Sequence, residues 1–219
     1  MTRLSIYAVC GRVTATLSVR GPGGELLGLV HGAGLCAVVG EWEPSGTTVD
    51  VLRAYDSLQR TLADRMPAVL PVRFGTCVQD VDEATWVLRA REKALHAALE
   101  LVRGRVQMTL RTMAHDGGAG AKAQALVPAR AASGADYLRS LAAAAELDDE
   151  VPVLAPVLAA ARPWVRAQRV EKGRAASSVF QLVPRDRVEA YSQAVREALA
   201  KARIEAALSG PFPAYAFAA

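Results

Sequence analysis

The chain has 219 residues and a formal net charge of +4, with 52% hydrophobic and 22% charged residues. This composition is ordinary for a globular protein of one domain or two small ones. No apolar run reaches the roughly 18 residues of a membrane-spanning helix, and none follows a basic N-terminal region, so we expect a cytoplasmic protein. The basic residues are dispersed among acids, which argues against nucleic-acid binding.

The first part of the chain alternates short apolar runs with helical patterns. Leu4–Cys10 and Leu35–Val39 are compact apolar runs, which predict two strands. The stretch between them, Gly11–Gly34, is rich in glycine and weakly patterned, so we expect a long loop there. Thr48–Arg65 is predicted to be a helix, because apolar residues recur at helical spacing at Val51, Tyr55, Leu58 and Leu62.

The stretch Val69–Thr76 is predicted to be a third strand that ends in a turn. Pro71 belongs at a strand edge because it cannot donate a ladder hydrogen bond, and Gly75 permits a sharp exit. Between them lie the permanent cation Arg73 and the aromatic Phe74. These two residues are candidates either for a structural clamp or for a partner contact. As a buried clamp, Arg73 would contribute to stability, and Arg73→Ala would lower it.

A helix and a strand follow this turn. Asp80–Glu83 resembles a capping box and predicts one long helix that Gly104 ends, with Ala84, Leu88, Leu95, Leu99 and Val102 on one face. Arg105–Arg111 alternates polar and apolar residues, which is typical of a half-buried strand. The sequence therefore predicts an N-terminal modified ferredoxin-like domain over residues 1–112, with a mixed or antiparallel sheet and helices on one face.

The second part of the chain is predicted to be a separate α+β domain. An Ala/Gly-rich segment, residues 113–133, is the expected linker, and the domain covers residues 134–219. Its expected elements, in order, are a helix from Gly134 to about Leu147, a second helical piece that ends near Pro163, strands at Trp164–Val170 and Ser178–Val183, a helix over Asp186–Ala202, and a closing strand from Ile204 to Ser209.

The C-terminal tail concentrates aromatic residues in a chain that has few. Phe212, Tyr215 and Phe217 follow one another within a proline-containing end that is predicted to be extended. Aromatic side chains left in water would form an apolar patch. The tail therefore either packs across the chain's own sheet or docks onto a partner strand or groove.

No combination of residues predicts a catalytic or metal site. His31, His96 and His115 are not at ligand spacing from one another or from a cysteine. Three dispersed cysteines, Cys10, Cys36 and Cys77, are typical of buried reduced thiols. We therefore expect no enzyme, no catalytic residue, no metal and no cofactor. A small-molecule or nucleic-acid binding module on a ferredoxin-like scaffold remains the alternative function.

Four stretches together carry a family resemblance: Val69–Thr76, Gly134–Leu138, Phe180–Arg185 and Ser209–Phe217. In these stretches and their order the chain resembles the gas vesicle accessory proteins of the GvpF/GvpL family. The resemblance implies an α+β protein of two domains without a catalytic role. It further implies an assembly factor or minor vesicle component that binds the hydrophobic shell subunit, gas vesicle protein A, and other accessory proteins. The implied location is the gas vesicle or the cytoplasm.

Overall fold

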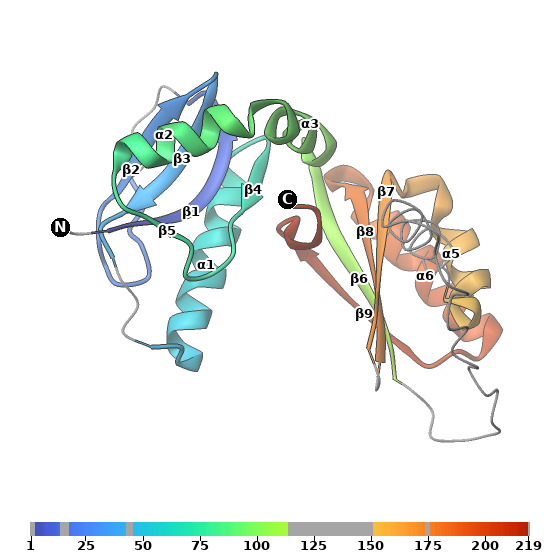
Figure 1. Ribbon diagram of the computed structural model, residues 1–219. Helices are drawn as coiled ribbons and strands as arrows, with labels where there is room; N and C mark the ends of the chain where they lie inside the picture. Colours follow the sequence, from blue (N-terminus) through green and yellow to red (C-terminus); the bar gives the residue numbers. More distant parts are fainter. Residues whose placement is uncertain (1–2, 14–17, 43–45, 114–150, 174–175, 219) are drawn as a thin grey trace, which may run out of the picture. The chain divides into compact units, whose positions relative to one another are not determined.

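The computed structural model describes residues 3–13, 18–42, 46–113, 151–173 and 176–218 (Figure 1). The expected linker, apart from Met113, the expected helix after Gly134 and His115 lie outside these residues. The strands are β1 (Leu4–Gly11), β2 (Leu27–Gly32), β3 (Leu35–Gly40), β4 (Val69–Pro71), β5 (Cys77–Val78), β6 (Arg105–Met113), β7 (Ala167–Lys172), β8 (Ala176–Pro184) and β9 (Ala206–Phe212). The α-helices are α1 (Val49–Arg65), α2 (Val81–Ala90), α3 (Glu92–Val102), α5 (Ala155–Ala161) and α6 (Val188–Ala202), and 3₁₀ helices are η1 (Pro152–Leu154), η2 (Arg162–Trp164), η3 (Arg185–Arg187) and η4 (Tyr215–Phe217).

The chain divides into two compact units. Unit 1 comprises residues 1–108, 182–186 and 210–219, and unit 2 comprises residues 109–181 and 187–209. The division passes through β6, β8 and β9. The units differ from the predicted domains at the C-terminus. The tail, which the sequence assigns to the second domain, is part of unit 1.

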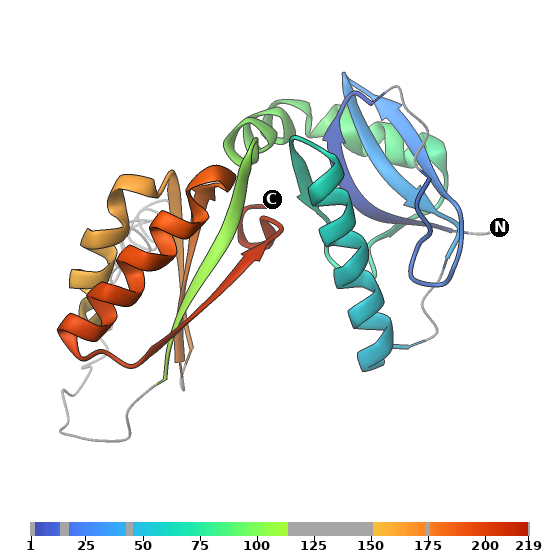
Figure 2. The same cartoon turned by 180° about the vertical axis from the view of Figure 1, so that it is seen from behind.

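The first sheet has the strand order β2-β3-β1-β4, and β5 also pairs with β1. All of these pairings are antiparallel. Helix α1 packs on the face that carries Tyr7 and Val38, in a core that includes Leu58 and Leu62. Successive strand residues point to opposite faces, and accordingly Ala37 lines a cavity with Leu88 of α2 instead. Helices thus cover both faces (Figures 1 and 2), whereas we expected them on one face only.

The glycine-rich stretch is not a long loop, because it contains β2. Strand β2 pairs with β3 along its whole length. Helix α2 lies so close to this strand that a Cβ atom added at Gly32 would meet Leu88 Cβ and the Thr85 carbonyl oxygen at 3.3 Å. Ala33 and Gly34, with φ of 53° and 72°, form the two-residue connection, in which both residues need positive φ. Gly32 thus allows α2 to pack closely on β2, and Gly34 allows the hairpin turn between β2 and β3.

The predicted long helix is two helices. Its start is as expected, since the Asp80 side chain accepts a hydrogen bond from the Glu83 amide and Glu83 in turn accepts one from the Gln79 amide. The expected apolar stripe is buried throughout. The chain nevertheless leaves helical geometry at Arg91, with φ −110° and ψ 13°, which separates α2 from α3.

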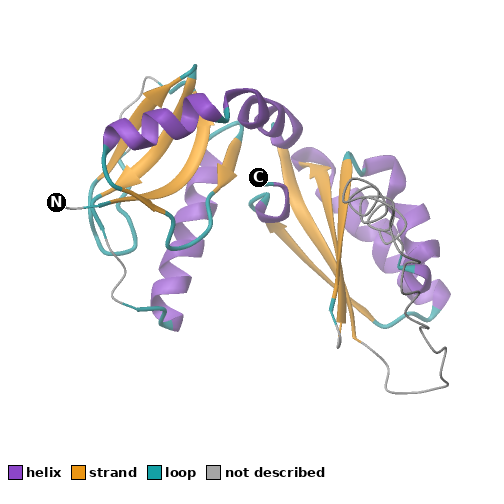
Figure 3. Ribbon diagram, in the orientation of Figure 1, coloured by secondary structure: helices purple, strands orange, loops and turns teal. Residues whose placement is uncertain are grey.

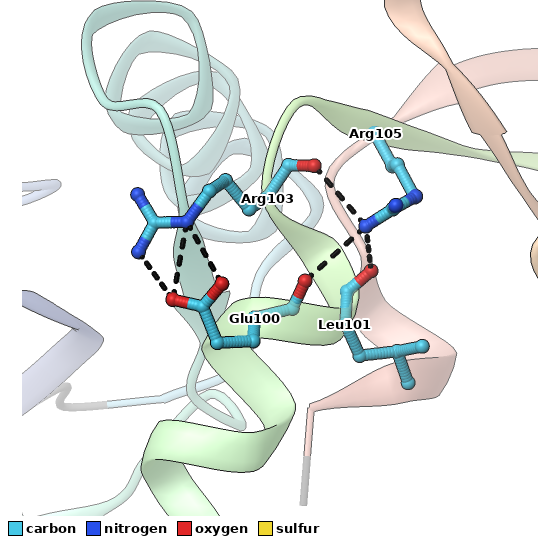
Figure 4. A network of polar contacts seen from close by, with 4 residues as sticks. All are labelled: Glu100, Leu101, Arg103 and Arg105. Atoms are coloured by element: carbon cyan, nitrogen blue, oxygen red, sulfur yellow. Dashed lines mark hydrogen bonds and ion pairs between the residues drawn. The ribbon is translucent and has the colours of Figure 1, made fainter.

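Arginine side chains close the C-terminal end of α3 (Figure 4). The Arg105 guanidinium donates from Nη1 to the carbonyl oxygens of Leu101 at 2.8 Å and Glu100 at 3.2 Å. Arg103 pairs with the Glu100 carboxylate at 2.6 Å, which raises the pKa of Arg103 and lowers that of Glu100. The cations thus lie where the helix presents its unpaired carbonyl groups.

The second sheet has the strand order β7-β8-β6-β9. The helices α5 and α6 lie beside its strands (Figures 1 and 3), and among the described elements the order along the chain is β6, α5, β7, β8, α6 and β9. This is the β-α-β-β-α-β succession of a ferredoxin-like arrangement. The expected α+β class with antiparallel sheets and helices is confirmed. The complete succession lies in the second sheet, whereas the sequence predicts a modified ferredoxin-like arrangement for the N-terminal part.

A polar chain of side chains joins α6 to the strands of this sheet. The Tyr191 hydroxyl donates a hydrogen bond to Gln181 Oε1 at 2.6 Å, and Gln181 Nε2 donates one to Gln168 Oε1 at 2.7 Å. Tyr191 is fully buried, and burial raises the pKa of its phenol. Every polar atom of the Gln181 amide group therefore has a partner, as buried polar groups require.

Candidate functional site

The C-terminal tail packs against its own unit. Phe217 is 2% exposed and Ala214 is also buried, while Phe212 is half-buried. Tyr215 retains 36% of its exposure. Phe212 and Phe217 therefore pack onto the chain itself, while the Tyr215 side chain stays accessible in part.

An acid–base pair on α1 holds the tail. Arg60 Nε donates to Asp56 Oδ2 at 2.7 Å, and the Tyr215 hydroxyl donates to Asp56 Oδ1 at 2.8 Å. The guanidinium carbon of Arg60 lies 5.0 Å from the centre of the Phe212 ring, within the range of a cation–π interaction. Because Asp56 and Arg60 are four residues apart, they face the tail from the same side of the helix.

These contacts shift the ionisation of the groups involved. Partial burial of Asp56 disfavours its charged form, but hydrogen bonds from Arg60 and Tyr215 outweigh this, and the pKa of Asp56 is lowered from its ordinary value. Burial raises the pKa of Tyr215 well above its usual range, and the neighbouring Asp56 carboxylate raises it further. At neutral pH the pair is thus an ionised acceptor and a neutral phenol donor.

Three further contacts support this arrangement within unit 1. The Ala216 amide donates to Gln107 Oε1 at 2.8 Å, which fixes the backbone of η4. Arg185 donates to the Ala63 carbonyl oxygen at 2.6 Å and pairs with Asp64 at 3.3 Å. The C-terminal half of α1 is therefore tied to segments that lie far from it in the sequence.

Arg73 is not a buried clamp, because its side chain is exposed. Its carbonyl oxygen instead accepts hydrogen bonds from the Thr76 amide and hydroxyl, which close the turn at Gly75, where φ is +82°. Phe74 packs edge-on against Tyr55, with ring centres 5.2 Å apart at 89°. Phe74 thus has a structural position beside the core, and Arg73 is free to meet a partner molecule.

An apolar cavity of about 610 Å³ lies between the first sheet and helices α2 and α3. Most of its lining is apolar, and the exposed residues Arg73, Thr76 and Arg91 and the tail residues Tyr215 and Ala218 line it as well. The sequence could not reveal this cavity, because its lining comes from segments whose proximity depends on the fold. Its buried apolar lining residues include Ile6, Val9, Ala37, Leu70, Leu88 and Leu95.

The cysteines and histidines that the structure describes form no ligand set. Cys10 and Cys36 are buried and free, as expected, whereas Cys77 is only half-buried. Burial raises the pKa of the Cys10 thiol to about 12, which leaves it protonated and unreactive. His31 Nδ1 lies 3.0 Å from Cys36 Sγ. In the described ranges, no group of three or more histidine, cysteine or acidic residues could hold a metal ion.

A family model and two solved structures match nearly the whole chain. The sequence model of the family described as "Gas vesicle synthesis protein GvpL/GvpF" matches residues 4–219. The structure is similar to that of the gas vesicle protein GvpF from Anabaena sp. PCC7120, with a TM-score of 0.71 at 15% identity, over 100% of this chain and 99% of the other. It is also similar to GvpF from Microcystis aeruginosa, with a TM-score of 0.73 at 12% identity and full coverage of both chains. Among curated protein sequences none matches the chain.

Proposed function

The chain belongs to the GvpL/GvpF family of gas vesicle synthesis proteins, and we propose from this premise that it is a non-catalytic assembly factor or minor component of gas vesicles. In this role it binds the hydrophobic shell subunit, gas vesicle protein A, and other accessory proteins, at the gas vesicle or in the cytoplasm. The family is one of gas vesicle proteins and not a class of enzymes. No helix among the described residues is both long and apolar enough to cross a membrane.

The observation that carries the proposed contact with an apolar subunit is the exposed indole of Trp86. Its side chain on α2 is 66% exposed. Tryptophan contributes strongly to protein interfaces, because one side chain buries a large apolar area at a small cost in conformational entropy. On α1, Val49 and Leu52 are also exposed, at 62% and 42%, and lie one helical turn apart. Unit 1 thus offers apolar side chains that a partner could cover.

Arg73 and the outer part of the tail are further candidates for contact with the same partners. Arg73 is exposed and Tyr215 is partly exposed, so a bound protein could reach both side chains. Phe212 and Phe217 have a different role in this proposal, since their packing holds Tyr215 in place. The proposed surface therefore combines one cation with apolar and aromatic groups, as protein interfaces commonly do.

A co-expression experiment tests the proposal. The tagged protein and the shell subunit are produced together, and the shell subunit that remains bound during affinity purification is quantified. The wild type should retain it, and Trp86→Ala should retain at least tenfold less. Leu26→Ala is the matched control, because Leu26 is 74% exposed but lies outside the helices. Thermal unfolding verifies that both variants are folded.

Two outcomes of this experiment separate the proposed function from the proposed role of Trp86. If the wild type retains neither the shell subunit nor any other vesicle protein, the proposed function is wrong. If the wild type and Trp86→Ala retain equal amounts, the function stands but Trp86 is not part of the contact.

A further inference from the structure

We propose that the cavity of unit 1 is a binding site for an amphipathic carboxylate, a molecule with an unbranched alkyl chain and one carboxylate group, of the fatty-acid type. The alkyl chain fills the apolar interior, and the carboxylate lies at the mouth between the guanidinium groups of Arg73 and Arg91. This site goes beyond the proposed assembly function and does not depend on it.

The interior of the cavity determines the apolar part of the ligand. Its volume of about 610 Å³ lies within the range of roughly 300–1,000 Å³ that is usual for small-molecule sites. One wall is the sheet, with Val9, Ala37 and Leu70, and the opposite wall is helical, with Leu88 and Leu95. All five side chains are buried and none can form a hydrogen bond, so the interior suits hydrocarbon.

The mouth of the cavity determines the charged part. Arg73 and Arg91 both line it and both side chains are exposed. Within the described part of the chain, no acceptor for a hydrogen bond or ion pair is found for either guanidinium group. Two cations next to an apolar interior are complementary to one anion on an apolar chain. Arginine suits a carboxylate because its planar fork of donors matches the two oxygens.

Hydrogen bonds made by lining residues hold the walls of the cavity in place. Tyr215 lines it while its hydroxyl binds Asp56. The turn that carries Arg73 is closed by the hydrogen bonds from Thr76. The break between α2 and α3 puts Arg91 at the rim and leaves both helices on the sheet. A cavity with fixed walls binds a ligand without the cost of ordering them first.

Calorimetric titration of the full-length protein with dodecanoate, below its micelle concentration, tests the site. Dodecanoate should bind saturably, and octanoate should bind much more weakly, because each buried methylene strengthens binding about fourfold. Dodecyltrimethylammonium, which has the same chain and the opposite charge, should bind at least tenfold more weakly than dodecanoate.

Variants locate the binding. Arg73→Ala and Arg91→Ala should each weaken dodecanoate binding about tenfold. Arg89→Ala is the matched control, because Arg89 is exposed on α2 but does not line the cavity, and it should leave binding unchanged. Val87→Trp should abolish binding by filling the cavity, since Val87 is half-buried in its wall. The arginine variants keep the test valid even if Val87→Trp does not fold.

Three results would overturn the proposal. The first is the absence of saturable dodecanoate binding to the wild type. The second is equal binding by Arg73→Ala, Arg91→Ala and Arg89→Ala. The third is a folded Val87→Trp variant that binds dodecanoate as tightly as the wild type, since the ligand would then lie outside the cavity.

Discussion

The hydroxyl group of Tyr215 lies 2.8 Å from the carboxylate of Asp56, although 159 positions separate the two residues in the sequence. Asp56 also binds Arg60, which in turn lies over the ring of Phe212. One carboxylate on α1 therefore connects two aromatic residues of the tail to this helix, and this connection can be tested residue by residue.

Removing the Tyr215 hydroxyl should weaken the attachment of the tail. Tyr215→Phe keeps the ring and loses the hydrogen bond to Asp56. A hydrogen bond to a charged group is worth about 1.5–3 kcal/mol when buried, but both side chains here are partly exposed, so we expect a loss of ~0.5–1 kcal/mol. Urea unfolding gives the free energy. In a double-mutant cycle, Asp56→Ala, which leaves the Tyr215 hydroxyl without this acceptor, should remove most of the effect of Tyr215→Phe, and full additivity would contradict the proposed coupling.

The same carboxylate should make the stability of unit 1 depend on pH. The pKa of Asp56 is lower in the folded protein than its ordinary value of about 3.9, so its ionised form is favoured by folding. This contribution is fully present above the ordinary pKa and is lost as the pH falls through the folded pKa. The difference in unfolding free energy between the wild type and Asp56→Asn should therefore be larger at pH 7 than at pH 3. A difference that stays constant over this interval would show that Asp56 ionisation is not linked to folding.

Two buried glutamines should respond differently to the same replacement. Gln181 uses both ends of its amide group, and Gln181→Met would leave the buried Tyr191 hydroxyl without its acceptor, at a cost of about 1–3 kcal/mol. Gln59 donates to the Tyr7 carbonyl oxygen at 2.7 Å, but its own buried Oε1 atom has no partner among the described residues. Because the Tyr7 oxygen also accepts from the Val72 amide, Gln59→Met should cost less than about 1 kcal/mol. Chemical unfolding gives the free energy of unfolding of each variant. A larger loss for Gln59→Met than for Gln181→Met would contradict the hydrogen-bond roles given to the two glutamines.

Arg73→Ala should leave stability almost unchanged. The side chain is exposed, and substitutions at such positions usually change the free energy of unfolding by less than about 0.5 kcal/mol. This expectation replaces the one drawn from the sequence, where a buried clamp would have made Arg73 important for folding. Differential scanning calorimetry of the variant decides between them. A large decrease in Tm would support the interpretation of Arg73 as a structural clamp.

Periodic patterns predicted burial well, because they depend on local geometry alone. Tyr55, Leu58 and Leu62 form the buried side of α1 as expected, and Leu88 and Leu95 are buried although the helix breaks between them. The break at Arg91 has no local signal, since neither proline nor glycine is present from Ala90 to Glu92. Helices α2 and α3 instead each pack against the first sheet, and this packing is a tertiary effect that the local sequence does not show.

The missed strand β2 shows the opposite limitation. Glycine usually weakens a strand signal, so Gly28 and Gly32 made this stretch look like a loop. In the fold, Gly32 is needed because α2 passes so close to the strand. The candidate site shows the same limitation. The aromatic tail was evident from the sequence, but its anchor at Asp56 and the arginine-rimmed cavity depend on contacts across the whole unit.

The inclusion of the tail in unit 1 has a consequence for biosynthesis. Residues 1–108 are synthesised long before Gly210–Ala219. Until translation is almost finished, the nascent first unit therefore lacks the buried Phe217 side chain and the hydrogen bond from Tyr215 to Asp56. Apolar surface that waits for a late segment is exposed to premature association. A message truncated before the tail would yield a chain with an unfinished first unit, and a bulky fusion after Phe217 would burden the same closing step.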